Sequence, residues 1–262
     1  MPVCKTWKEF FSRSSFIDQN FKESKSELVI QARHGRHMKT KLIEIGKELE
    51  CESRELGKNQ SREIHSSCDG FLLMSEPGDS GKLQVINPAT EFCVTVPRCP
   101  SGCLHGACSA AIAFDSSTKQ YKVVHVVNDY YYRFEIFNLS SADENWERVS
   151  GPWEDINDRP FNLGNFYWKN AVSINGRILH WYVESSEYFI SMEVKEAGFT
   201  RTYLPERGDV INKTNNYALV GLGGFLSVVY CDSDTQMDVW ILEDFHGQLW
   251  SKKHTIVAEL TN

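Results

Sequence analysis

The stretch VINPATEFCVTVP (85–97) holds two apolar runs on either side of the polar break NPAT (87–90). An Asn side chain can accept a hydrogen bond from a backbone N–H about two residues ahead and so close a turn. A hydroxyl group three residues after the Asn can bond back toward the same turn. Backbone N–H and C=O groups at the end of one strand then have hydrogen-bond partners before the next strand begins. The stretch therefore predicts a β-hairpin that is bent by its own polar side chains.

The same arrangement occurs at three other places, DSST (115–118), NLSS (138–141) and DSDT (232–235). In each case an apolar run ends in Asn or Asp, and a Ser or Thr follows three residues later. A Gly-containing turn followed by an apolar strand also recurs, in CDGFLLM (68–74), INGRILHWY (174–182) and GLGGFLSVVY (221–230). The two repeated features together indicate β-units of similar design.

The spacing of these units predicts the fold. Most apolar runs are short, β-branched or aromatic, and bounded by turn-forming residues. The units recur at roughly 40–50 residues, which is the range of four-stranded propeller blades. Five units follow from this count: 27–45, 66–97, 108–150, 170–205 and 217–257. We therefore expect an all-β propeller of about five units, in which the first unit is incomplete and the sequence as given stops before a closing blade.

Two segments lie outside this β-pattern. Near the start, Val3, Trp7, Phe10 and Phe11 fall on one stripe of a short helix. The stretch 46–63 is highly charged and offers no apolar face, so it predicts a solvated loop.

The composition limits the classes of function. The 262 residues are 41% hydrophobic, which is enough for a core, and the formal net charge is −7. This acidic balance argues against nucleic acid and anionic membrane surfaces as partners, because both attract proteins with a basic excess. The sequence has no apolar run long enough to span a membrane, and its start, MPVCKTWKEFF, does not have the pattern of a signal peptide. We therefore expect its cysteines to stay reduced, in the cytoplasm or the nucleus.

With these residues assembled, the chain resembles the plant F-box proteins that carry an F-box-associated, kelch-like domain. Six segments in the family's order carry the likeness: VCKTWKEFFSRSSFI (3–17), SCDGFLLM (67–74), VINPAT (85–90), AAIAFDSSTKQYKVV (110–124), INGRILHW (174–181) and VWILED…WSKKHTI (239–256). The first segment looks like the end of an F-box. The resemblance implies that 1–22 is the C-terminal remnant of an F-box and that 23–262 is the associated kelch-like β-propeller.

The resemblance implies a substrate-recognition subunit of an SCF-type ubiquitin ligase, with no chemistry of its own. The F-box binds a Skp-type adaptor, and the associated domain captures the protein to be ubiquitinated. The residues that match the adaptor-binding helix are Val3, Cys4, Trp7 and Phe11. Because the earlier F-box helices are absent here, we expect weakened adaptor binding. Two alternatives stay open: a stand-alone propeller interaction module that no longer binds the ligase, and a propeller hydrolase.

Two loops are candidates for capturing the unidentified substrate protein, DYYYR (129–133) and GPWEDINDRPFNLGNFYW (151–168). Propellers bind partners through loops, and Tyr, Trp and Arg dominate binding hot spots. The candidate residues are Tyr130, Tyr131, Arg133, Trp153, Arg159 and Phe161. The alternative is that the aromatic side chains among them simply cover the ends of blades.

Metal binding and catalysis find little support in the sequence. Soft or borderline metal ligands gather in CPSGCLHGAC (99–108), at Cys99, Cys103, His105 and Cys108. Their spacing matches no common zinc knuckle, so the sequence favours a reduced loop with no metal and no cofactor. There is also no Gly-x-Ser-x-Gly, His-Glu-x-x-His or phosphate-binding glycine loop, and we expect no enzyme activity.

Overall fold

The computed structural model describes residues 27–34, 37–45, 51–55, 63–76, 79–88, 92–102, 109–127, 133–140, 145–151, 171–183, 185, 187–206, 217–231 and 236–257. In these residues the chain forms nineteen strands in five antiparallel sheets. No helix in this part of the chain has the length and apolarity to cross a membrane.

Four of the sheets share one design, in which four consecutive strands are joined in chain order. We call these sheets blades I to IV. Blade I consists of β4 (Ile64–Cys68), β5 (Phe71–Glu76), β6 (Asp79–Asn87) and β7 (Phe92–Val96). Blade II consists of β8 (Ser109–Asp115), β9 (Gln120–Val127), β10 (Arg133–Asn138) and β11 (Trp146–Ser150). Blade III consists of β12 (Val172–Ile174), β13 (Ile178–Trp181), β14 (Tyr188–Glu193) and β15 (Gly198–Tyr203). Blade IV consists of β16 (Tyr217–Leu222), β17 (Phe225–Cys231), β18 (Gln236–Asp244) and β19 (Leu249–Val257).

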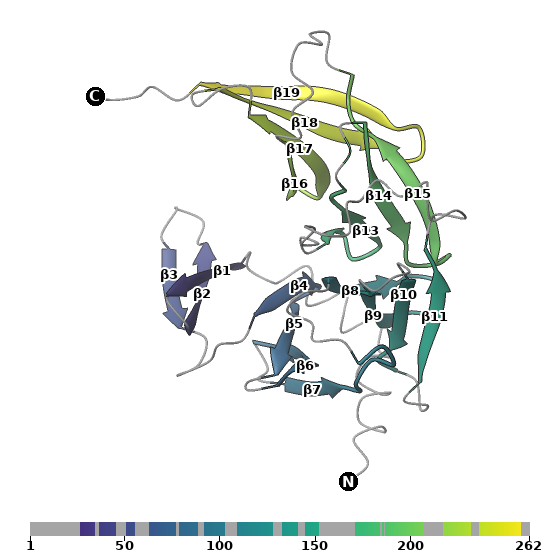
Figure 1. The fold of residues 1–262 in the computed structure, drawn as a ribbon. Helices are drawn as coiled ribbons and strands as arrows, with labels where there is room; N and C mark the ends of the chain where they lie inside the picture. The colour runs from purple at the N-terminus through teal and green to yellow at the C-terminus, as the bar shows by residue number, and fades with distance from the viewer. Residues whose placement is uncertain are drawn as a thin grey trace.

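The blades follow one another along an arc (Figure 1). The first strands of the blades meet on the inside, where β4 contacts β8 and β12, and β12 contacts β16. The last strands, β7, β11, β15 and β19, lie on the outside of the arc. This radial order confirms the predicted all-β, propeller-like fold. Each of the last four predicted units also coincides with one blade.

The fifth sheet corrects one prediction. It consists of β1 (Glu27–His34), β2 (His37–Ile45) and β3 (Cys51–Glu55), in that order. The solvated loop predicted for 46–63 is therefore wrong at β3, which pairs with β2. An edge strand needs only backbone pairing and commonly carries charged side chains, so it shows no apolar alternation. The short helix predicted near the start lies outside the described residues.

Glycine turns close the first hairpin of three blades. In each turn two successive residues have positive φ: Asp69 and Gly70 (50° and 79°), Asn175 and Gly176 (52° and 65°), and Gly223 and Gly224 (59° and 83°). The first and last pairs form two-residue loops, whereas the middle pair belongs to the three-residue loop between Ile174 and Ile178. Gly, Asn and Asp suit these positions because L-residues with larger side chains resist positive φ. The repeated Gly-containing turn predicted from the sequence is therefore confirmed.

The predicted Asn and Asp turns are confirmed where the structure describes them. Asp115 Oδ1 accepts hydrogen bonds from the backbone N–H of Ser117 at 2.8 Å and of Thr118 at 3.3 Å. Asn138 Oδ1 accepts one from Ser140 N–H at 3.0 Å. The hydroxyl that bonds back in the first turn belongs to Ser117, not to Thr118 three residues on as predicted. The first turn joins β8 to β9 and the second joins β10 to β11, so this motif marks hairpins rather than one equivalent place in every blade.

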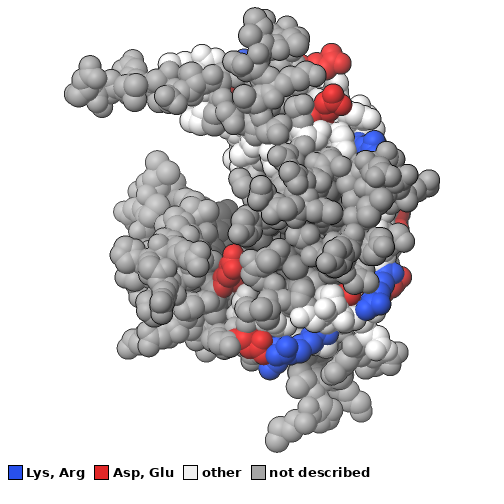
Figure 2. All heavy atoms as spheres, viewed as in Figure 1, with Lys and Arg blue, Asp and Glu red and all other residues white. Residues whose placement is uncertain are grey.

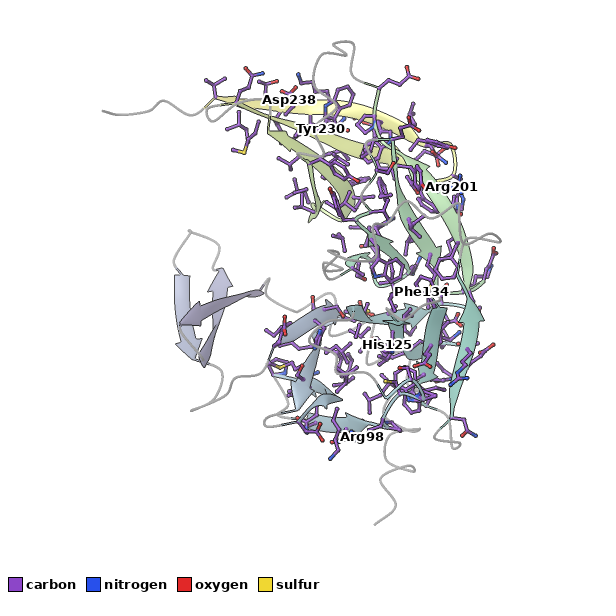
Figure 3. The ribbon with its side chains drawn as sticks, in the orientation of Figure 1. Arg98, His125, Phe134, Arg201, Tyr230 and Asp238 are labelled. Carbon is purple, nitrogen blue, oxygen red and sulfur yellow. The ribbon has the colours of Figure 1, made fainter. Side chains whose placement is uncertain are left out.

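The hydrophobic core lies between successive blades. Side chains of β10 alternate, so Phe134 packs with Trp181 between blades II and III, whereas Phe137 packs with Tyr121 and Leu73 between blades I and II. The rings of Phe134 and Trp181 meet edge to face, with centroids 5.7 Å apart. Figure 3 labels Phe134 where these two blades meet. Blade II is therefore buried on both faces, against blade I on one side and blade III on the other.

Candidate functional site

Most of the residues predicted to bind partners lie outside the described residues. This holds for the adaptor-binding set and for five of the six loop candidates, which are Val3, Cys4, Trp7, Phe11, Tyr130, Tyr131, Trp153, Arg159 and Phe161. Their grouping stays a prediction. The remaining candidate, Arg133, begins β10 and pairs through its backbone with Val127 of β9 and Ser150 of β11.

This pairing places the ends of two candidate loops side by side. Val127, Arg133 and Ser150 form one row across blade II. The segment 128–132 connects the first two of these residues, and the segment that follows Ser150 leaves from the same end. Ser109, which pairs with Val126, begins β8 at this end too. We call this end of blade II the loop edge.

A row of charged and polar side chains crosses blade II two residues inward from the loop edge. Arg148 of β11, Glu135 of β10 and His125 of β9 are successive register partners. Glu135 and His125 are fully buried, and His125 Nδ1 lies 3.4 Å from Glu135 Oε2. Arg148 Nε lies 3.5 Å from the other carboxylate oxygen, Oε1. Figure 3 labels His125 inside the blade.

Two residues that follow the last strand of blade I complete this group. Cys99 is 4% exposed. The Ser101 hydroxyl lies 3.2 Å from Cys99 Sγ and 3.1 Å from Glu135 Oε2. One ligand atom each from Cys99, His125 and Glu135 lies within 4.8 Å of the others. We call Cys99, Ser101, His125 and Glu135 the polar centre.

The charge of the polar centre follows from its hydrogen bonds. Burial raises the pKa of Glu135, but hydrogen bonds from His125 and Ser101 outweigh this effect, so the pKa is lowered from its ordinary value. Glu135 is therefore an ionised carboxylate inside the fold. Such a group is costly unless it is paired or bound to a metal ion.

Blades I and III hold simpler buried pairs at similar depth. His65 Nε2 lies 2.8 Å from Ser75 Oγ, and His180 Nδ1 lies 2.8 Å from Ser191 Oγ. Burial lowers the pKa of His180 to about 3, so its imidazole is neutral at pH 7. Ser191 is fully buried and also bonds Thr202. Because no substrate can reach Ser191, this pair is a structural link between strands.

Tryptophans at the start of outer strands tie successive blades together. Trp146, which begins β11, donates its indole N–H to the carbonyl oxygen of Pro97 after blade I, at 3.1 Å. Trp250 of β19 donates to the carbonyl oxygen of Tyr203 in blade III, at 2.9 Å. Sequence reasoning missed their shared role. The signal was a Trp in the first or second position of the last strand of a unit.

Comparison with known proteins gives the family. The family model described as the F-box associated beta propeller domain matches residues 17–262. The chain belongs to this family. Two relatives from Arabidopsis thaliana, F-box protein At3g07870 and F-box protein At1g30790, are each 24% identical to it. The matches cover 74% and 71% of this chain, and 51% and 48% of the relatives. The chain thus spans about half the length of the curated relatives it matches.

Solved structures add weaker likenesses. A putative 6-phosphogluconolactonase from Bacteroides fragilis has a TM-score of 0.38 and 13% identity, over 87% of this chain and 70% of that chain. A chain from a study of two prolyl endopeptidases has a TM-score of 0.43 and 13% identity, over 99% of this chain and 42% of that chain. At these TM-scores neither likeness bears on the function of this F-box associated domain.

The described surface of the F-box associated domain carries mixed charge. In Figure 2, basic and acidic side chains alternate along the outer edge, and neither sign gathers into a large patch in this view. Exposed large apolar side chains concentrate on blade IV, at Leu222, Phe225, Met237, Leu249, Ile256 and Val257. Among the described residues, this view shows no broad basic surface.

Proposed function

We propose that this chain is the substrate-recognition part of an SCF-type ubiquitin ligase, acting in the cytoplasm or the nucleus. Membership of the F-box associated beta propeller domain family carries the proposal, together with relatives that are named F-box proteins. In this role the chain performs no reaction. It holds a target protein near the ligase and so raises the effective concentration of the target's lysines.

The loop edge of blade II is the proposed capture surface. The loop candidates, among them Tyr131 and Trp153, belong to segments that leave this edge. The strands below them are firmly held, because Phe134 is fully buried and Arg133 lies between two paired strands. A rigid scaffold that presents variable loops is the usual way in which binding proteins change partners without changing their fold.

Affinity capture of the tagged chain from plant cells, with chemical crosslinking, tests this proposal. We expect a Skp-type adaptor, a cullin and one reproducible further protein, whose ubiquitinated fraction falls when the chain is removed. Capture of that protein without adaptor or cullin would support a stand-alone interaction module and overturn the ligase role. Turnover of an ester or sugar substrate by the purified chain, abolished by one carboxylate substitution, would instead overturn the non-enzymatic role.

A further inference from the structure

In the polar centre, His125 and Glu135 are joined by a long hydrogen bond, and the same distance also suits two ligands of one metal ion. The separation of 3.4 Å between His125 Nδ1 and Glu135 Oε2 exceeds the usual range for a hydrogen bond, about 2.7–3.2 Å. Two atoms bound to one tetrahedral zinc ion at about 2.0–2.1 Å stand roughly 3.3–3.4 Å apart. The His125 and Glu135 atoms therefore already have the separation of two ligands of one ion.

The third group adds a sulfur ligand. The Cys99 thiol belongs to the same cluster, in which all three ligand atoms lie within 4.8 Å of one another. A tetrahedral zinc ion places sulfur and nitrogen ligands roughly 3.6 Å apart. Binding an ion would shorten the separations from Cys99 Sγ, which are at most 4.8 Å, by no more than about 1.2 Å. Cys99 is buried, as are His125 and Glu135, so bulk water does not compete freely for the ion.

The chemistry of the three ligands favours zinc among the common divalent ions. A thiolate disfavours Mg²⁺ and Ca²⁺, which prefer oxygen ligands, whereas zinc accepts sulfur, nitrogen and oxygen together. One thiolate and one carboxylate neutralise the charge of a divalent ion. Glu135 Oε1 faces Arg148, while Oε2 faces His125 and the Ser101 hydroxyl. The surrounding groups thus orient Oε2 toward the proposed ion, as supporting residues do in metal sites.

We propose that Cys99, His125 and Glu135 bind one zinc ion, which links the segment after blade I to the middle strands of blade II. The fourth position is left to water or to the Ser101 hydroxyl. The ion acts as a structural link below the loop edge, because its ligands are buried and it binds the folded chain. The proposal is independent of the ligase role. It does not depend on Cys103, His105 or Cys108, which lie outside the described residues.

Titration of the purified full chain, stripped of metal, with Zn²⁺ and with Co²⁺ tests this site. We expect one equivalent of either ion and a thiolate-to-cobalt charge-transfer band. Cys99→Ser should abolish the band, and Glu135→Gln should weaken zinc binding at least about tenfold. Cys93→Ser and His254→Gln are matched controls, since both residues are exposed in blades I and IV, and they should bind like the unaltered chain.

Thermal unfolding supplies a second readout, in which each variant is compared with itself in the presence and absence of chelator. Chelator should lower the melting temperature of the zinc-loaded chain and of the two controls, because zinc binds the folded state. It should lower the melting temperature of Glu135→Gln by less than that of the unaltered chain, and leave that of Cys99→Ser nearly unchanged. The proposal is overturned if the chain binds no zinc, or if Cys99→Ser keeps one equivalent with the cobalt band intact. Unchanged zinc affinity in Glu135→Gln would overturn it as well.

Discussion

The indole N–H of Trp146 in blade II donates a hydrogen bond to the carbonyl oxygen of Pro97, 49 residues earlier, at the end of blade I. Pro97 follows the last residue of β7, so its carbonyl oxygen lies beyond the strand pairing. The indole N–H gives this oxygen a hydrogen-bond partner. Trp250 repeats the contact between blades IV and III. A propeller is stable only when its blades are joined, and these bonds join blades at their outer strands.

Replacement of Trp146 by Phe should lower the free energy of unfolding by about 1 kcal/mol more than the matched change Trp240→Phe. Both substitutions remove the same atoms. Trp240 Nε1 is buried without a hydrogen-bond partner in the structure, so its loss removes no bond. Urea unfolding followed by circular dichroism measures the difference. Equal losses in the two variants would show that the bond to Pro97 adds nothing to stability.

Gly176→Ala should destabilise the chain more than Gly223→Ala. Both glycines have positive φ, 65° and 59°, so each alanine meets a backbone penalty of roughly 1–2 kcal/mol. Only at Gly176 would the new Cβ also meet a neighbour, because it would overlap with Cys68 Sγ, whereas Gly223 faces open space. Melting temperatures of the two variants check this order. A Gly176→Ala variant as stable as Gly223→Ala would mean that the blade I–III contact is looser than described.

Because His180 is buried, the free energy of unfolding should fall as the pH is lowered. Its pKa is lowered to about 3 by burial, below the unfolded value of about 6.5. The unfolded chain therefore binds the proton more readily between these pH values, and the stability that the neutral imidazole contributes above pH 6.5 is lost as the pH falls toward 3. This one group contributes at most about 1.4 kcal/mol per pH unit.

Urea unfolding at pH 7, 6, 5 and 4 measures this slope. His180→Asn should be less stable than the unaltered chain at pH 7 and should show a shallower decline below pH 6. His254→Gln, which changes an exposed histidine, should keep the original slope. The prediction is wrong if His180→Asn declines as steeply as the unaltered chain.

The loop edge should contribute to partner capture without contributing to folding. Removal of residues 153–166 should abolish capture of the partner found by crosslinking, and Arg133→Ala should weaken it about tenfold or more, as at other binding hot spots. Arg201→Ala, at an exposed arginine over the Tyr188 ring in blade III, is the control and should leave capture unchanged. Loss of the cooperative unfolding transition on deletion would instead assign those aromatic side chains to the core.

Local features of the sequence were sufficient for the hairpins. Asp69 and Gly70, or Asp115 and Ser117, act within a few residues of one another, so the turn they form follows from φ preferences and short-range hydrogen bonds. The 40–50-residue spacing then predicted blades in the right places. The strand Cys51–Glu55 escaped prediction because its sequence, CESRE, is charged and shows no apolar alternation, although its backbone pairs with β2.

The sequence by itself thus determined the turns, the strands of the four blades and their order, because these depend on neighbours in the chain. Only the tertiary structure decided that Cys99 meets His125 and Glu135, which lie far from it in the sequence. Strand register places Glu135 opposite His125, and packing of blade I against blade II supplies the thiol. Contacts of this kind depend on how the sheets pack against one another, and the spacing of residues in the sequence does not predict them.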